Sequence, residues 1–327
     1  MAEYINIKGT NRQVLSSDPS NPTLGQIWYN TTSNTLKGSV FQSTGSWETG
    51  GNLGTASLDG ASAGTQTAAI YAGRVTGAGN YTNTSEKYDG TSWTATNSLN
   101  TPRRSGTGIG TQGAASVVSG QTTGGGSTAA VENFDGTNWT AGPSINTARR
   151  GLASSASGTQ TAMIVFAGYS SSATESWNGS TWATVNAMSV ARLLPGGAGI
   201  QTAALCMGGD PTGGGGPGVN NTEEWDGTNW ATGGTLGTAR YAGGSAGIQT
   251  AALYMSGTSG PGGIRTQVEG YDGTSWSSET AVPTGKQKTN GAGTKALGFM
   301  IGGQPNTANT FEFTGAGAPL TKTIATS

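Results

Sequence analysis

The sequence predicts an all-β fold built as a ring of equivalent units, and three observations lead to this prediction. A phrase of forty-odd residues recurs six times along the chain. Each copy contains short apolar or alternating runs that end at turn residues, as β-strands do. Glycine contributes 58 of the 327 residues and interrupts every window long enough for an amphipathic helix. A period of this length is typical of stacked or ring-shaped repeat proteins.

The chain begins with a segment outside the repeat, residues 1 to 35. Residues 4–9 alternate between apolar and polar side chains, which indicates a half-buried strand. Residues 16–22 contain two prolines among Ser, Asp and Asn, and this composition favours turns. Residues 25–32 and 35–41 then read as two further strands.

Part of this segment resembles a known leader. The run from Asp18 to Pro22, followed by residues 25–32 and by Leu36-Lys37, is similar to a leader in bacteriophage virion structural proteins. There the leader precedes fibre, tail and appendage domains, which implies that this segment docks onto another virion protein. The candidate docking residues are Tyr4, Ile7, Trp28 and Tyr29.

The repeats are in register from residue 45 onward. Their anchors lie 43 to 48 residues apart and are Trp47, Trp93, Trp139, Trp182, Trp230 and Trp276. Ten residues after these anchors stand Ser57, Arg103, Arg149, Arg192, Arg240 and Lys286. A Gln column follows nine residues later in most repeats, and a Glu-x-aromatic-Asp/Asn-Gly phrase precedes five of the tryptophans. Several columns therefore recur in a fixed order.

Each repeat reads as four short antiparallel strands. The first follows the basic position, and the second is a continuous apolar run such as residues 251–255. The third ends at the aromatic residue of the Glu phrase, and the Asp-Gly turn leads into the fourth, which starts at the Trp. Four strands in each repeat of this length predict a β-propeller.

The phrases also resemble kelch repeats between about residues 45 and 315. An apolar strand that ends in Gly-Gly, as at Gly208-Gly209, is followed by the Glu phrase and then by the Trp. This chain departs from the kelch pattern where Ala-Gly or Ser-Gly replaces Gly-Gly, as at Ala72-Gly73 and Ser119-Gly120. The resemblance implies a kelch-like propeller.

The ends of the repeat region complement each other. The last repeat has no Trp strand, and the strand at Trp47 has no apolar run before it. Pairing them would remove two exposed sheet edges, so we expect a six-bladed propeller whose sixth blade is closed by the Trp47 strand. The expected regions are a docking segment at 1–35, a propeller at 36–318 and a tail at 319–327. Seven blades are the alternative, if residues 28–41 add strands to the ring.

Composition excludes most catalytic classes. There is no histidine, hence no His general base and no zinc site of the usual types, and Cys206, the one cysteine, lies in an apolar run. Carboxylates outside the repeat columns are scattered, unlike a glycosidase pair. We therefore expect no enzyme, catalytic residue, cofactor or metal. The net charge of −1 argues against nucleic-acid binding, and no apolar run is long enough for a membrane span.

Positions that recur in every repeat are expected to be structural, and positions that vary are expected to carry function. The Trp column should pack between blades, and the Glu and Arg columns should pair. The connections from second to third strand vary most and should emerge on one face of the ring. The residues in them best suited to binding are Arg74, Tyr81, Asp210, Asn220 and Arg265.

The expected function is that of a non-enzymatic virion structural protein, made in the host cytoplasm and displayed on the particle as a rigid propeller. Its expected partners are other virion proteins. The alternative is an adhesin that binds a glycan or protein of the host surface. A third possibility is a bacterial kelch-type scaffold or lectin outside any virion.

Overall fold

The structure, a computed structural model, describes residues 13–19, 26–41, 44–77, 79–169, 171–316 and 319–324. Within these ranges the chain forms β-strands and no helix, so no helix here is able to cross a membrane. The predicted all-β class is confirmed. The strand expected at residues 4–9, with the candidate docking residues Tyr4 and Ile7, lies outside the described residues.

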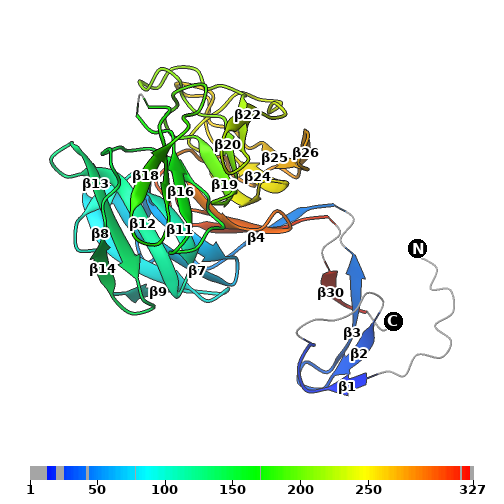
Figure 1. The fold of residues 1–327 in the computed structure, drawn as a ribbon. Helices are drawn as coiled ribbons and strands as arrows, with labels where there is room; N and C mark the ends of the chain where they lie inside the picture. Colours follow the sequence, from blue (N-terminus) through cyan, green and yellow to red (C-terminus); the bar gives the residue numbers. More distant parts are fainter. Residues whose placement is uncertain are drawn as a thin grey trace. The chain divides into compact units, whose positions relative to one another are not determined.

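Contacts divide the chain into two units (Figure 1). The terminal unit combines Met1–Ser46 with Thr314–Ser327, and the propeller unit is Trp47–Phe313. The sequence placed these boundaries at 35/36 and 318/319 instead. They shift because the strand at residues 35–41 pairs with strands near both chain ends and adds none to the ring.

The terminal unit contains one sheet in the order β1-β2-β3-β30. Its strands are β1 (Gln13–Leu15), β2 (Ile27–Asn30), β3 (Thr35–Phe41) and β30 (Pro319–Thr323). β1 runs parallel to β2, and the other pairs are antiparallel. Figure 1 shows β3 in blue and β30 in dark red, so strands from opposite ends of the chain meet in this sheet.

Asp18 is the polar centre of the terminal unit. Its carboxylate accepts hydrogen bonds from Trp28 Nε1 at 3.0 Å and Asn30 Nδ2 at 2.7 Å, and it pairs with Lys37 Nζ at 2.7 Å. Bonds from Lys37, Asn30 and Trp28 lower the pKa of Asp18 to about 2. Trp28, expected as a docking residue, is fully buried and is instead structural, whereas Tyr29 is half-buried and bonds to Asn34.

The propeller unit contains six sheets, numbered here in chain order. Sheet 1 consists of β5 (Ser57–Leu58), β6 (Ala61–Thr65), β7 (Ala68–Thr76), β8 (Tyr81–Tyr88) and β9 (Trp93–Thr96). Sheet 2 consists of β10 (Arg103–Arg104), β11 (Thr107–Thr111), β12 (Ala114–Thr122), β13 (Ser127–Phe134) and β14 (Trp139–Gly142). Sheet 3 consists of β15 (Ala153–Ser154), β16 (Met163–Phe166), β17 (Thr174–Trp177) and β18 (Trp182–Val185).

The remaining three sheets have four strands each. Sheet 4 consists of β19 (Gly196–Ile200), β20 (Ala203–Met207), β21 (Thr222–Trp225) and β22 (Trp230–Thr232). Sheet 5 consists of β23 (Gly244–Ile248), β24 (Ala251–Met255), β25 (Val268–Tyr271) and β26 (Trp276–Glu279). Sheet 6 consists of β27 (Asn290–Gly293), β28 (Leu297–Ile301), β29 (Thr310–Thr314) and β4 (Ser46–Thr49).

Sheet 6 is assembled from both ends of the repeat region, as the sequence predicts. β4 pairs with β29, and the Trp47 ring lies 5.0 Å from the Phe313 ring, centroid to centroid. The inner strands contact one another in a closed cycle, from β6 through β11, β15, β19 and β23 to β27 and back to β6. The strands of residues 28–41 stay outside this cycle, in the terminal sheet.

The apolar core lies between adjacent sheets. Each of six buried clusters joins side chains from two neighbouring sheets, and one of them joins sheet 6 to sheet 1. Glycines on the inner strands allow these sheets to approach closely. A Cβ on Gly197, for example, would lie 2.4 Å from the Ser154 carbonyl oxygen. The high glycine content is thus part of the packing.

Candidate functional site

The Arg and Glu columns form buried ion pairs within the sheets. The pairs are Arg103–Glu132, Arg149–Glu175, Arg192–Glu223 and Arg240–Glu269. The second carboxylate oxygen of each Glu accepts a backbone N–H from the segment that enters the same sheet; the donors are Asn100, Asn146, Ser189 and Gly237. Each Glu therefore holds both a guanidinium and a loop, which is the structural role that the sequence predicts.

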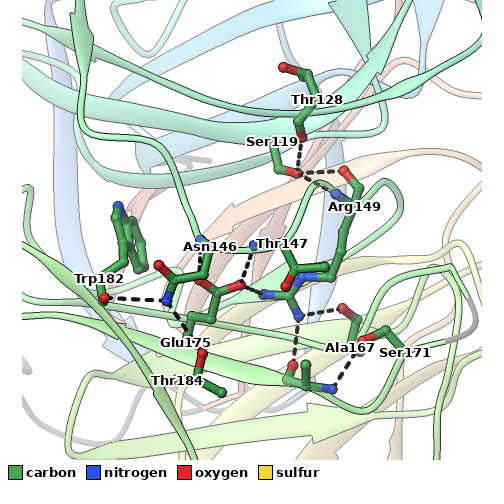
Figure 2. Close-up of polar contacts among 11 residues, drawn as sticks. Ser119, Thr128, Asn146, Thr147, Arg149, Ala167, Ser171, Glu175, Trp182 and Thr184 are labelled. Carbon is green, nitrogen blue, oxygen red and sulfur yellow. Dashed lines mark hydrogen bonds and ion pairs between the residues drawn. The ribbon is translucent and has the colours of Figure 1, made fainter.

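Figure 2 shows this network in sheet 3. Arg149 donates from Nη2 to Glu175 at 2.8 Å and from Nη1 to the carbonyls of Ala167 at 3.0 Å and Ala173 at 2.6 Å. Burial lowers the pKa of Arg149, and the charge of Glu175 opposes that decrease. A buried charge is tolerated only when it is satisfied in this way.

Sheet 1 obtains its guanidinium from a different place in the repeat. Its column position is Ser57, and Arg74, from the end of β7, pairs with Glu86 instead. Arg74 is 3% exposed, so its expected role as a binding-loop residue is wrong. The reason is that β7 and β8 are longer than predicted, which places Arg74 inside a strand.

Sheet 6 departs from the pattern at three positions together. Lys286 replaces Arg, Phe311 replaces Glu, and Pro283, which has no N–H, stands where the other repeats offer a backbone donor. Lys286 is 5% exposed and forms no ion pair among the described residues. Burial lowers the pKa of its amine.

The Gln and Trp columns connect neighbouring sheets. Gln249 Nε2, for example, donates to the carbonyls of Ala204 and Trp225 in sheet 4 at 3.0 and 2.7 Å. Trp276 Nε1 reaches back from sheet 5 to Thr222 Oγ1 in sheet 4 at 3.0 Å. Because these columns serve as contacts between sheets, they are unavailable as a row of ligand-binding aromatics or amides.

Six residues at the start of the inner strands form what we call the axial ring: Asp59, Ser105, Gly151, Leu194, Ala242 and Lys288. All have a left-handed φ, between 51 and 62°. Five of them donate a backbone N–H, at 2.8 to 2.9 Å, to the carbonyl of the preceding member of the ring. Asp59 is one of these five donors, and its acceptor is the carbonyl of Lys288, the last member in the sequence. The ring fixes the backbone at one mouth of the central channel.

A cavity of about 520 Å³, which we call the mouth cavity, lies at the axial ring. It is lined by Asp59, Arg104, Ser105, Arg150, Leu193, Leu194, Asp210, Gly213, Gly214, Gly215, Tyr241, Gly260, Pro261, Gly262, Gln287 and Lys288. A narrower cavity of about 80 Å³, which Asp59 and Ser105 also line, lies between the inner strands. The mouth cavity is in the size range of small-molecule sites.

The lining of the mouth cavity has its cations on one side and its apolar side chains on the other, and each side also contains one carboxylate, Asp59 and Asp210 respectively. Lys288, Arg104 and Arg150 come from sheets 6, 2 and 3, and Asp59 of sheet 1 stands between Lys288 and Arg104 around the axial ring. Leu193, Leu194 and Tyr241 come from sheets 4 and 5, together with Asp210 and the glycine-rich loops at 213–215 and 260–262. This separation of charge and apolar surface suits a ligand with two chemically different ends.

Two of the cations are held in place by their surroundings. Arg104 donates from Nε to Gln121 Oε1 at 2.9 Å, and its guanidinium lies 4.8 Å from the centroid of the Tyr81 ring and 3.7 Å from Asp59. The Arg150 guanidinium lies 4.1 Å from the centroid of the Tyr169 ring. Stacking on an aromatic ring restricts a guanidinium without removing its hydrogen-bond donors.

The two carboxylates of the cavity are not equivalent. Burial raises the pKa of Asp59, although the hydrogen bond from Ser105 and the charges of Arg104 and Lys288 oppose the rise. Burial also acts to raise the pKa of Asp210, but hydrogen bonds from the Thr212 side chain and the loop backbone outweigh it, and the net pKa is lowered. Both oxygens of Asp210 are occupied by its own loop, so it shapes the cavity wall.

The loop residues singled out from the sequence fall into different places. Asp210 lines the mouth cavity in the structural role just described. Tyr81 lies behind Arg104 and bonds to Gln121 at 3.2 Å. Asn220 is exposed, and Arg265, half-buried, donates to Ser259 at 2.9 Å; neither lines the cavity. A binding role for these last two residues stays a prediction.

Sequence reasoning missed Arg104, Arg150, Tyr241 and Lys288. They stand one or two positions after the basic column, inside a connection that looked like part of the regular repeat. A signal was present, because the position directly after the column varies more than the column itself. Its occupants are Leu58, Arg104, Arg150, Leu193, Tyr241 and Gln287.

The described residues contain no group of three or more His, Cys, Asp or Glu side chains able to hold a metal ion. Cys206 is buried, and burial raises the pKa of its thiol to about 12. The thiol is therefore protonated at neutral pH, which makes it a poor nucleophile and metal ligand.

Comparison with known proteins shows the fold. No protein-family model and no curated protein matches the sequence. Among solved structures, the chain is similar to YjhT, a kelch-like β-propeller, with a TM-score of 0.65 and 12% identity over 80% of this chain and 95% of YjhT. The predicted β-propeller class is thereby confirmed. An identity this low carries the fold and no function.

Proposed function

We propose that this chain is a non-enzymatic structural protein of a bacteriophage virion. In this proposal the terminal unit docks onto another virion protein, and the propeller is displayed on the particle. The proposal rests on the residues of the segment that resembles a virion-protein leader. Its Asp18, Trp28, Asn30 and Lys37 form the polar centre of a small sheet that is separate from the propeller.

The propeller itself supports a scaffold role. Its most numerous acid and base side chains, the Glu and Arg columns, are paired within the sheets and hold backbone loops in position. A rigid ring with variable connections at one mouth is suited to display.

The docking role is tested with an Asp18→Asn variant in the phage. The neutral amide loses the ion pair with Lys37, and we expect incorporation of the protein into particles, measured by mass spectrometry, to fall several-fold. Asp226→Asn is the matched control, because Asp226 caps a propeller hairpin at the position where sheet 3 already has Asn178. Absence of the wild-type protein from purified particles, or unchanged incorporation of Asp18→Asn, contradicts the proposal.

A second candidate function, adhesion to a host-surface glycan or protein, is favoured by the mouth cavity. A virion protein is able to serve both roles, so the readout is host attachment by fully assembled particles. Adhesion predicts that substitutions in the cavity lower attachment while particle yield and protein copy number stay constant. Unchanged attachment argues for display alone.

A further inference from the structure

We propose that the mouth cavity binds a small ligand that carries an oxyanion group, a carboxylate or a phosphate, on an apolar body. The oxyanion faces Arg104, Arg150 and Lys288, and the apolar body faces Leu193, Leu194 and Tyr241. The cavity lies wholly within the propeller unit, so this site does not depend on where the terminal unit docks.

The charges that line the cavity favour an anionic ligand. The chain as a whole is nearly neutral, with a net charge of −1, yet three cations converge on one half of this cavity. Of the two carboxylates there, Asp210 accepts hydrogen bonds from its own loop, and Asp59 lies 3.7 Å from Arg104 and also interacts with the charge of Lys288. Three cations against two carboxylates leave an excess of one positive charge, and a concave site focuses that excess.

The geometry of the two guanidinium groups also favours an oxyanion. Tyr81 and Gln121 fix Arg104, and Tyr169 fixes Arg150, while both guanidinium groups remain partly exposed. In the scaffold columns, by contrast, each Arg is almost fully buried against a Glu. Arg104 pairs with Asp59 at 3.7 Å, and Arg150 forms no ion pair among the described residues. Planar guanidinium groups that are held in place in this way are suited to carboxylate and phosphate oxygens.

Asp59 gives the site a built-in competitor for the ligand. It stands between Lys288 and Ser105 in the axial ring, and its carboxylate accepts a hydrogen bond from Ser105 Oγ at 2.6 Å. Its negative charge opposes an incoming oxyanion and engages Arg104. Asn tolerates the left-handed backbone of this position, where φ is 62°, so Asp59→Asn removes the charge with little strain.

The test is calorimetric titration of the full chain with benzoate and with phenyl phosphate, each against a neutral analogue, benzamide and phenol. We expect at least one oxyanion to bind and its neutral analogue to bind about tenfold more weakly or not at all. Tighter binding of benzoate identifies a carboxylate ligand, and tighter binding of phenyl phosphate identifies a phosphate ligand. Absence of binding by both oxyanions at millimolar concentration overturns the proposal.

Four variants locate the site. Arg104→Gln and Lys288→Gln are expected to weaken oxyanion binding about tenfold each, and Asp59→Asn is expected to strengthen it several-fold. Arg265→Gln is the matched control, since Arg265 belongs to the connection whose residues 260–262 line the cavity but does not itself line it. Thermal unfolding of each variant shows that the propeller is intact. Equal effects of Arg104→Gln and Arg265→Gln, or weaker binding by Asp59→Asn, overturn the proposal.

Discussion

At the scale of single residues, each buried Glu of the propeller performs two tasks at once. Glu175 neutralises Arg149 and accepts the N–H of Asn146. Removing one member of a buried pair leaves the other charge unsatisfied, whereas an exposed charge contributes little. The recurrence of this arrangement explains why the sequence keeps Arg and Glu in column although the paired residues do not line the mouth cavity.

Glu175→Gln therefore should destabilise the protein substantially. The amide still accepts from Asn146 but leaves the guanidinium of Arg149 without a counter-charge, and we expect a loss of about 3–5 kcal/mol in the free energy of unfolding. Denaturant titration measures it. Glu48→Gln, on the exposed side of β4, is the control and should stay within about 0.5 kcal/mol of wild type. A similar small effect for Glu175→Gln would show that the pair is not a determinant of stability.

Lys286 is a place where the chain is predicted to gain stability by mutation. It is buried without a carboxylate partner among the described residues, so Lys286→Met should raise the free energy of unfolding, by up to about 1 kcal/mol. A lysine whose pKa is lowered in the folded state is more readily protonated in the unfolded chain. Its cost is therefore present below the folded pKa and disappears as the pH rises towards the ordinary value of 10.5.

The difference between Lys286→Met and wild type should accordingly shrink as the pH rises through that window. Thermal unfolding of both proteins between neutral and alkaline pH measures the difference, and the tyrosines that titrate at high pH cancel in the comparison. A variant less stable than wild type at neutral pH would mean that the amine has a favourable partner.

At the scale of the elements, the Trp strand joins one sheet to the next. Trp139 packs on Phe134 of its own sheet, at 4.9 Å between ring centroids, and belongs to the cluster that also contains Ala61 and Ile70 of sheet 1. One side chain therefore holds two sheets together. This explains why the outermost strand of each propeller sheet, otherwise short and half-exposed, has Trp at its first or second residue.

Trp139→Ala should lower the free energy of unfolding by about 3–5 kcal/mol, because it leaves a large void between sheets 1 and 2. Trp276 is only half-buried, and Trp276→Ala is the comparison, with a smaller loss expected. Chemical denaturation of both variants provides the measurement. A loss below about 1 kcal/mol at Trp139 would mean that the ring is not part of the core.

At the scale of the whole molecule, the repeat period and the incomplete ends were enough to predict a propeller closed by the strand at Trp47. The terminal sheet was not predictable in the same way, because β3 and β30 lie at opposite ends of the sequence and share no repeat pattern. The mouth cavity was missed for another reason. Residues such as Lys288 and Leu194 adopt a left-handed backbone that nothing in their side chains signals.

Sheets 1 and 6 depart from the Arg and Glu columns, and the repeat pattern alone does not predict what replaces the missing residues. In sheet 1 the basic position of the column is occupied by Ser57, and Arg74 supplies the cation from the end of a neighbouring strand. In sheet 6 the cation Lys286 is present but forms no ion pair among the described residues, since Phe311 replaces the carboxylate and Pro283 replaces the backbone donor. Spacing along the chain predicted which positions matter, but contacts between strands determined how each departure is compensated.

In this structure β4 closes the ring, and calorimetric unfolding of two truncated chains tests that closure. One chain begins at residue 45 and keeps β4, and the other begins at residue 50 and lacks it; both end at residue 316. The first is predicted to unfold in a single cooperative transition. The second should aggregate or lose that transition, because sheet 6 is left with an exposed edge at β29. Equally cooperative unfolding of the two chains at the same temperature would contradict closure by β4.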